Sequence, residues 1–197
     1  MSRVAREIIE AVVLALIVFL IIQTGVRNFK VEGASMQPTL EGGQYLLVNK
    51  LVYFKLDMAR LSRVIPFWVV DQSSEAGERF ALRPPQRGEV IVFHYPRDTT
   101  KDFVKRVIGL PGEKVGVEGG DVFIDGKQLV EPYLTSRDTS SSNAIILGDN
   151  EYYVMGDNRR GSNDSRNWGP VAGELVLGKV WFVYWPISKL HVIGGAP

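Results

Sequence analysis

The sequence predicts a mostly β protein, in which one N-terminal transmembrane helix precedes an antiparallel β-sheet domain. The first observation behind this is a nearly uncharged apolar run close to the N-terminus. The second is the alternation of short apolar runs with glycine- and proline-rich turns through the rest of the chain, where no segment keeps the period of a helix. A length of 197 residues suits one domain with a small insertion.

The apolar run, IIEAVVLALIVFLIIQTGV, covers residues 8–26 and contains one charge, Glu10. At about 1.5 Å per residue, a helix of this length nearly spans a hydrocarbon core of about 30 Å. We therefore expect a transmembrane anchor at 8–26 after a short N-terminus, 1–7. A cleaved secretory signal peptide is the alternative, because Arg3 and Arg6 form a basic start. The anchor is favoured, since the run is long and no small-residue cleavage site follows it.

Several apolar or alternating runs after the anchor predict strands. In one of them, Asp125-Gly126 is a two-residue hairpin turn. We predict a main β domain at 27–114 and 151–197, and a small inserted β subdomain at 115–150, which holds this hairpin and a serine-rich loop. The predicted strands are contained in FKVEG, QYLLVNKLVYFKL, RGEVIVFHYP, KDFVKRVIGLPGE, GGDVFIDGKQLV, EYYVMGDN and ELVLGKVWFVYWP.

Residues 57–86 separate two of these strands and carry an apolar cluster that contains Phe67 and Trp68. Two interpretations stay open. In the commoner arrangement, the cluster packs on the sheet. In the other, it enters the surface of the bilayer, where tryptophan is favoured.

Composition excludes several function classes. Lysine and arginine total 23 and aspartate and glutamate total 22, so the chain has no electrostatic footprint for nucleic acid. The absence of cysteine excludes disulfides, thiol catalysis and cysteine-ligated zinc. A calcium loop beginning at Asp157 fails, because Arg159 and Gly161 stand where oxygen ligands belong. We expect neither a metal nor a cofactor.

Ser35 lies in a turn-rich stretch, GASMQPTL, which can expose its hydroxyl and leave backbone N–H groups free for an oxyanion. A nucleophilic serine needs a base, and the chain has only two histidines, His94 and His191. Neither has a neighbouring carboxylate in a motif-like context. We interpret His94 as a structural strand residue and His191 as incidental.

Lys105 is the other candidate base, because it lies between apolar residues of a predicted strand, DFVKRVIGLPG. Burial disfavours the charged ammonium and lowers its pKa. A lysine tuned in this way can take the proton of a serine hydroxyl. In the alternative, the side chain of Lys105 extends to water and Arg106 is equally exposed.

A third stretch, MGDNRRGSNDSRNWGP, is rich in Gly, Asn, Asp and Ser. By itself it is typical of a long turn. Beside a serine–lysine pair, Ser162 could orient the lysine amine by a hydrogen bond. Asp164 and Arg166 could brace the loop as an ion pair.

Together these stretches resemble bacterial type I signal peptidases. The matching blocks are SMQPTL, GGQYLLVNK, KRVIGLPGE and GDNRRGSNDSR, in the order of that family and after an N-terminal anchor. The resemblance implies an antiparallel β-sheet catalytic domain of signal-peptidase type. It also implies these roles: Ser35 is the nucleophile, Lys105 the general base and Ser162 the residue that orients it; Asp164 and Arg166 form an ion pair; Asp157 and Asn158 belong to the structural loop; and Met36, Leu40, Phe103 and Val104 line the substrate pockets.

One position departs from the family's pattern. Some members carry a serine hydroxyl two residues before the nucleophile, and here that position is Gly33. The oxyanion would therefore depend mainly on backbone N–H groups, including that of Ser35.

The resemblance implies a membrane serine endopeptidase that cuts signal peptides from exported preproteins after small residues at −1 and −3. Its expected partners are those signal peptides, the lipid bilayer and the nearby secretion translocon. Its expected place is the plasma membrane, single-pass, with the N-terminus in the cytoplasm and the catalytic domain on the outer face.

Two other functions stay open. A self-cleaving Ser–Lys regulator of the LexA-like kind needs a DNA-binding segment, and the anchor stands in its place. A membrane-anchored β domain that binds exported chains without cleaving them is disfavoured by the presence of both Ser35 and Lys105.

Overall fold

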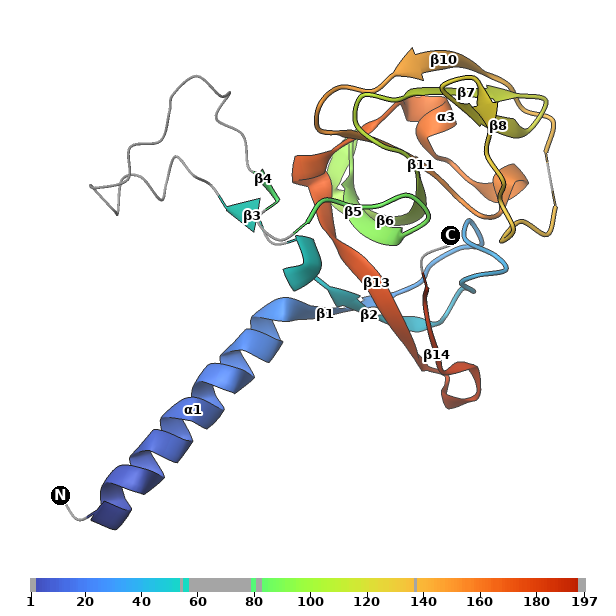
Figure 1. Cartoon of the computed structure of the whole chain (residues 1–197). Coiled ribbons are helices and arrows are strands. Elements are labelled where there is room, and N and C mark those ends of the chain that lie inside the picture. Colours follow the sequence, from blue (N-terminus) through green and yellow to red (C-terminus); the bar gives the residue numbers. More distant parts are fainter. Residues whose placement is uncertain (1–2, 54, 57–78, 81–82, 137, 195–197) are drawn as a thin grey trace, which may run out of the picture.

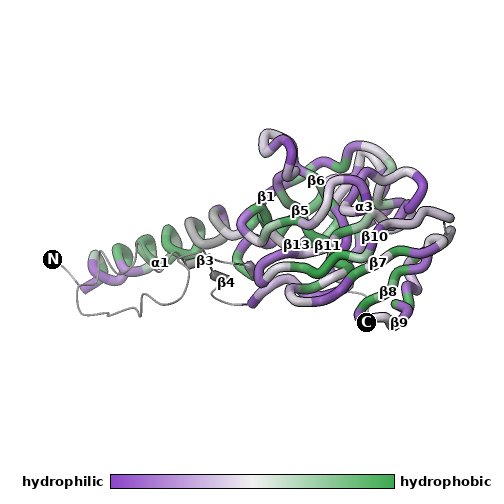
Figure 2. The backbone as a smooth tube through the Cα atoms, turned by 90° about the horizontal axis from the view of Figure 1, so that it is seen from above, coloured by the Kyte–Doolittle hydropathy of each residue, from purple (hydrophilic) through white to green (hydrophobic). Residues whose placement is uncertain are grey.

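A computed structural model describes residues 3–53, 55–56, 79–80, 83–136 and 138–194. The N-terminal helix α1 (Arg3–Gly25) projects away from the β domain (Figure 1). Hydrophobic residues occupy much of its length (Figure 2), and their side chains are exposed, as at Leu14 and Phe19. Within the part of the chain that the structure describes, no helix combines the length and apolarity needed to cross a membrane. The transmembrane helix expected at 8–26 is therefore not confirmed.

The main sheet confirms the predicted antiparallel β class. Every strand pair in it is antiparallel. Strand β13 lies between β2, which follows the turn that holds Ser35, and β5, which pairs with the strand that carries Lys105. The strands in spatial order are β1 (Val26–Lys30), β2 (Tyr45–Asn49), β13 (Val176–Trp185), β5 (Val90–Tyr95), β6 (Asp98–Gly109), β11 (Glu151–Met155) and β12 (Val171–Ala172), with β14 (His191–Val192) beside β13.

A second sheet lies in the part of the chain where an inserted subdomain is expected. It has the order β10 (Ser142–Ile146), β7 (Lys114–Glu118), β8 (Asp121–Ile124) and β9 (Lys127–Gln128). The predicted turn joins β8 to β9, and both of its residues have positive φ, 50° at Asp125 and 79° at Gly126. Strands β7 and β10 were not predicted, because glycine interrupts the apolar alternation of the first and polar residues begin the second.

One predicted strand is broken in the structure. QYLLVNKLVYFKL forms β2, then the 3-10 turn η1 (Leu51–Tyr53) and the short strand β3 (Lys55–Leu56), which pairs with β4 (Arg79–Phe80). The Asn49 side chain accepts a hydrogen bond from Val52 N at 3.2 Å, which favours a turn at this point. The remaining short elements are η2 (Arg159–Gly161), α3 (Ser165–Trp168), η3 (Gly173–Leu175) and η4 (Ile187–Lys189).

The two sheets share a hydrophobic core around Gly109, at the end of β6. A Cβ atom at this position would lie 2.5 Å from Val115 Cγ2 and 3.0 Å from Tyr153 Cβ. Because only glycine lets the small sheet approach so closely, β7 packs against the end of β6, the strand that carries Lys105, and against its neighbour in the main sheet, β11. Phe67 and Trp68 lie outside the described residues, so their predicted surroundings are not tested.

Candidate active site

Ser35 lies in a turn between β1 and β2. The turn is anchored by the side chains of Met36 and Leu40, which are fully buried and pack in the same hydrophobic cluster as Val31. Leu40 N donates to Met36 O at 2.9 Å and closes the turn. Ser35 itself is half-buried. We expected Met36 and Leu40 to line a substrate pocket. In the structure they are core residues, and they fix the position of Ser35.

Lys105 reaches Ser35 from β6. Its Nζ donates to Ser35 Oγ at 2.8 Å and to the carbonyl oxygen of Val104 at 3.0 Å. The side chain is 3% exposed, so it does not extend to water. Burial lowers the pKa of Lys105 to about 8, although the negative charges of Asp164 and Asp157 act in the opposite direction.

A lysine with this pKa is usable as a base at neutral pH. With a pKa of about 8, roughly a quarter of the amine is neutral at pH 7.5, against about 0.1% for an unperturbed lysine. The distance between Nζ and Ser35 Oγ lies within the range for direct proton transfer. The pair can therefore carry out nucleophilic catalysis without histidine.

The loop after β11 fixes the backbone of Ser35. Asn158 N donates to Ser35 O at 3.0 Å, and its side-chain Nδ2 donates to Ala34 O at 3.0 Å. Gly156 permits this approach, since a Cβ there would lie 2.4 Å from Ser35 O and 2.3 Å from Ser162 Oγ. Asn158, expected in a structural loop, thus binds the backbone carbonyl groups of Ser35 and Ala34.

Ser162 lies beside Gly156, but its buried hydroxyl has no hydrogen-bond partner among the described residues. The expected hydrogen bond from Ser162 to the amine of Lys105 is therefore not present in this structure. The expected ion pair is present: Arg166 Nε lies 2.8 Å from Asp164 Oδ1, and both side chains are buried. Asp164 also accepts from Gly156 N at 3.1 Å, which ties the pair to the loop under Ser35.

Asp157 forms a second buried ion pair that the sequence did not suggest. Its carboxylate accepts from Arg106 Nη2 at 2.6 Å and from Thr39 Oγ1 at 2.5 Å. Arg106 also donates to Gly88 O at 2.7 Å and is 3% exposed. The alternative interpretation, in which Lys105 extends to water and Arg106 is equally exposed, is therefore excluded. An arginine in the middle of an apolar strand was the available signal, since such a residue needs a buried partner.

A groove of about 560 Å³ runs past Ser35 and Lys105. Two of the expected pocket residues, Phe103 and Val104, line it, whereas Met36 and Leu40 do not. The described residues provide no acceptor for the backbone N–H of Ser35, so this group is available to an oxyanion at the groove. The other lining residues are Phe29, Lys30, Val31, Glu32, Gly33, Ala34, Leu46, Val92, Lys101, Asp102, Gly161 and Asn163.

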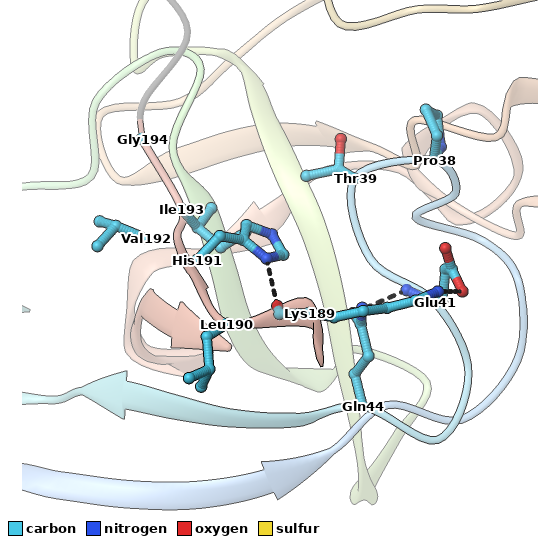
Figure 3. A pocket seen from close by; sticks show the side chains of 10 residues that line it. All are labelled: Pro38, Thr39, Glu41, Gln44, Lys189, Leu190, His191, Val192, Ile193 and Gly194. Atoms are coloured by element: carbon cyan, nitrogen blue, oxygen red, sulfur yellow. Dashed lines mark hydrogen bonds and ion pairs between the residues drawn. The ribbon is translucent and has the colours of Figure 1, made fainter. Parts of the chain in front are cut away.

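Neither histidine lines the groove that contains Ser35 and Lys105. His94 has a carboxylate neighbour after all, because Asp102 lies opposite it on β6 with Oδ1 2.7 Å from Nδ1. His191 lines a separate hollow of about 450 Å³ behind the Ser35 turn, where its Nδ1 donates to Lys189 O at 2.8 Å (Figure 3). Among the described residues, no group of three or more acidic, histidine or cysteine side chains is placed to hold a metal ion.

The family model for "Signal peptidase, peptidase S26" matches residues 5–185. A probable signal peptidase I-2 of Synechocystis sp. is 31% identical over 202 residues, which cover 97% of this chain and 76% of that protein. The signal peptidase I of Bacillus caldolyticus is 34% identical over 176 residues, which cover 82% of this chain and 81% of that protein.

A crystal structure of a signal peptidase I from Enterococcus faecalis aligns with a TM-score of 0.44 at 32% sequence identity, covering 50% of this chain and 97% of that one. The family match takes in both the Ser35 turn and the strand that carries Lys105. The chain belongs to the signal peptidases of peptidase family S26, which are serine peptidases.

Proposed function

We propose that this chain removes N-terminal signal peptides from exported preproteins, with Ser35 as nucleophile and Lys105 as general base. The observation that carries the proposal is the 2.8 Å contact between Lys105 Nζ and Ser35 Oγ inside a buried site. The main β domain, 27–114 and 151–197, carries the chemistry in this proposal. The inserted subdomain, 115–150, supports it.

Lys105 first acts as a base. The neutral amine takes the hydroxyl proton while Ser35 Oγ attacks the carbonyl carbon of the scissile bond. The oxyanion that forms is stabilised by the backbone N–H of Ser35, because Gly33 offers no side chain. The lysine ammonium then gives its proton to the leaving amine. In the second half, Lys105 takes a proton from the water that attacks the acyl-enzyme, and gives this proton to Ser35 Oγ as the ester bond breaks.

Specificity for small residues at −1 and −3 follows from the groove in this proposal. The half-buried side chains of Phe103 and Val104 form its wall beside Lys105, and Phe29, Leu46 and Val92 continue the apolar lining. An apolar groove with fixed walls favours small side chains, since larger ones would have to displace packed residues.

Attachment to the lipid bilayer is a further part of the proposal. Apolar side chains on α1 are exposed, and so is a group at the far end of β13 and around β14. Tryptophan is favoured at a membrane surface, and exposed apolar patches commonly mark interaction sites. We propose a single pass in the plasma membrane, with the N-terminus in the cytoplasm and the β domain outside, near the translocon. The exposed group is Trp181, Trp185, Ile187, Leu190 and Val192.

Cleavage of a synthetic preprotein by the purified full chain, with the cut position read by mass spectrometry, tests the proposal. We expect a cut after a small residue, and loss of activity in Ser35→Ala. Lys105→Arg should lose about 10²- to 10⁴-fold, because a guanidinium stays protonated and cannot act as a base. Circular dichroism should show that both variants fold. Retained activity in a folded Lys105→Arg variant would rule out the Ser–Lys mechanism.

A further inference from the structure

A hollow of about 320 Å³ lies across the Ser35 turn from the groove. One wall of the hollow is formed by Gln37, Pro38 and Glu41, which follow Ser35 in the chain. The opposite wall is Thr135 and Ser136, from the segment between β9 and β10. We call residues 131–136 and 138 of that segment the strap. Asn158 also lines the hollow.

The turn that holds Ser35 contributes residues to both the groove and the hollow. Gly33, Ala34 and Ser35 line the groove, whereas the hollow begins at Gln37. Asn158, which lines the hollow, binds the carbonyl oxygens of Ala34 and Ser35. When the cleaved bond of a peptide lies over Ser35 Oγ and its signal-peptide side lies in the groove, the hollow is a neighbouring space into which its remaining residues can extend.

The strap is a fixed wall, because its first part is anchored by buried charges. Glu131 pairs with Arg159, and the two side chains are 6% and 1% exposed. Tyr133 Oη donates to Glu131 Oε1 at 2.6 Å, and its ring stacks 4.0 Å from the guanidinium carbon of Arg106. The second part is anchored by Asp138, which accepts from Arg166 Nη1 at 2.6 Å. Thr135 and Ser136 lie between these two anchors.

The lining of the hollow differs from that of the groove. Amide, hydroxyl and carboxylate groups dominate the hollow, with Pro38 as the one ring, while apolar side chains dominate the groove beside Val104. An open polar hollow accepts an extended peptide through direct and water-mediated hydrogen bonds and tolerates many side chains. This is the chemistry needed for the polypeptide that leaves after cleavage, whose sequence differs from one substrate to the next.

We propose that the hollow binds the first residues after the cleaved bond, and that Ser136 of the strap influences which residues are accepted there. This rests on the proposed function, because it assigns a second part of the same substrate. Successive residues of an extended peptide advance about 3.3 Å each. The test therefore scans three successive substrate positions, +2 to +4, which together cover about 10 Å of extended peptide.

A charge exchange tests this. Full-length Ser136→Glu and Ser136→Arg are assayed with preprotein peptides that carry Lys or Glu at +2, +3 or +4. At one or more of these positions, Ser136→Glu should raise the ratio of kcat/KM for Lys over Glu, and Ser136→Arg should lower it. Each change should be roughly two- to fivefold, the size expected of an exposed ion pair. Both substitutions should be tolerated, since Ser136 is exposed.

Asn143→Glu and Asn143→Arg are the matched controls, because Asn143 is an exposed residue of β10, the strand that follows the strap, and does not line the hollow. The ratios should stay unchanged in them. Unchanged ratios at all three substrate positions in the Ser136 variants, or equal changes in the Asn143 variants, would overturn the inference.

A peptide that ends in p-nitroanilide after the −1 residue separates this inference from the proposed function. It has no residue for the hollow, so all variants should cleave it at the wild-type rate. Cleavage of this peptide, together with no charge preference at +2, +3 or +4 in the longer preprotein peptides, would reject the inference alone. Failure of the wild-type chain to cleave either kind of substrate would reject the proposed function.

Discussion

Lys105 and Arg106 are neighbours on β6, each 3% exposed, yet their surroundings differ. Among the described residues, the amine of Lys105 donates hydrogen bonds only to uncharged oxygens, those of Ser35 and Val104. The guanidinium of Arg106 is held by both oxygens of the Asp157 carboxylate, at 2.9 and 2.6 Å. Burial without a direct counter-charge makes a cation that can lose its proton, whereas burial with one makes a permanent structural charge. In the proposed mechanism, one of these adjacent residues is the general base and the other is a structural charge.

Removing the counter-charge of Arg106 should have the largest effect on stability. Asp157→Ala leaves a guanidinium buried and unpaired, which costs about 3–5 kcal/mol in comparable cases. Urea unfolding of the full chain measures this. Combining Arg106→Met with Asp157→Leu removes both charges and should recover most of the loss. A cost below about 1 kcal/mol for Asp157→Ala would show that Arg106 does not depend on its partner.

Replacing Lys105 by methionine should act in the opposite direction. The pKa of Lys105 falls from 10.5 to about 8 on folding, so the unfolded chain binds the proton more tightly. The resulting penalty is complete below about pH 8 and disappears above about pH 10.5. Lys105→Met should therefore stabilise the protein by up to about 3 kcal/mol at pH 7, with the gain fading as the pH rises.

Unfolding of Lys105→Met at pH 7 and pH 10.5 checks this expectation. Lys127→Met is the control, because Lys127 is exposed and should show no such pH dependence. A stability gain that does not change with pH would mean that packing, rather than the buried charge, accounts for it.

The pH dependence of cleavage gives a third measurement. The rate should rise about tenfold per pH unit and level off near the pKa of Lys105, about 8, because only the neutral amine accepts the proton. A profile that levels off near 6.5 would instead indicate a histidine base.

The smallest effect is expected at His94. It forms a partly exposed pair with Asp102 at the rim of the sheet, and such pairs contribute less than about 1 kcal/mol. His94→Gln should leave the cleavage rate within about twofold of wild type, measured at saturating peptide. A large loss of rate in a folded His94→Gln variant would point to a role for this pair in the groove.

Much of the sheet was predictable because its strands carry strong local patterns. The runs that hold β5, β6, β11 and β13 are apolar and bounded by turn residues, and each forms a strand. Strand β10 escaped prediction since its residues are mostly exposed, so no alternation marks it. The break after β2 was not predicted, because it depends on the hydrogen bond that the Asn49 side chain accepts from Val52 N. A hydropathy pattern contains no information about such bonds.

The site was predictable at its centre and less so around it. Motif resemblance brought Ser35 and Lys105 together, and the structure has them in contact. The pairing of Arg106 with Asp157 joins residues 51 positions apart, which no local pattern reveals. The position of Met36 has the same origin: an apolar residue beside Ser35 suits a pocket or a core equally well, and tertiary packing places it in the core.

Helix α1 passes into β1 without an intervening loop, and Ser35 follows Gly25 by ten residues. Strand β1 is paired with β2 along its whole length, and Lys50 N donates to Gly25 O at 2.8 Å, so this connection is stiff. Ten residues extend over at most about 35 Å. In the proposed membrane arrangement, the nucleophile is therefore held at a set height above the bilayer. The chain would act as a molecular ruler, selecting peptide bonds by their distance from the end of a substrate's apolar segment as well as by their flanking side chains.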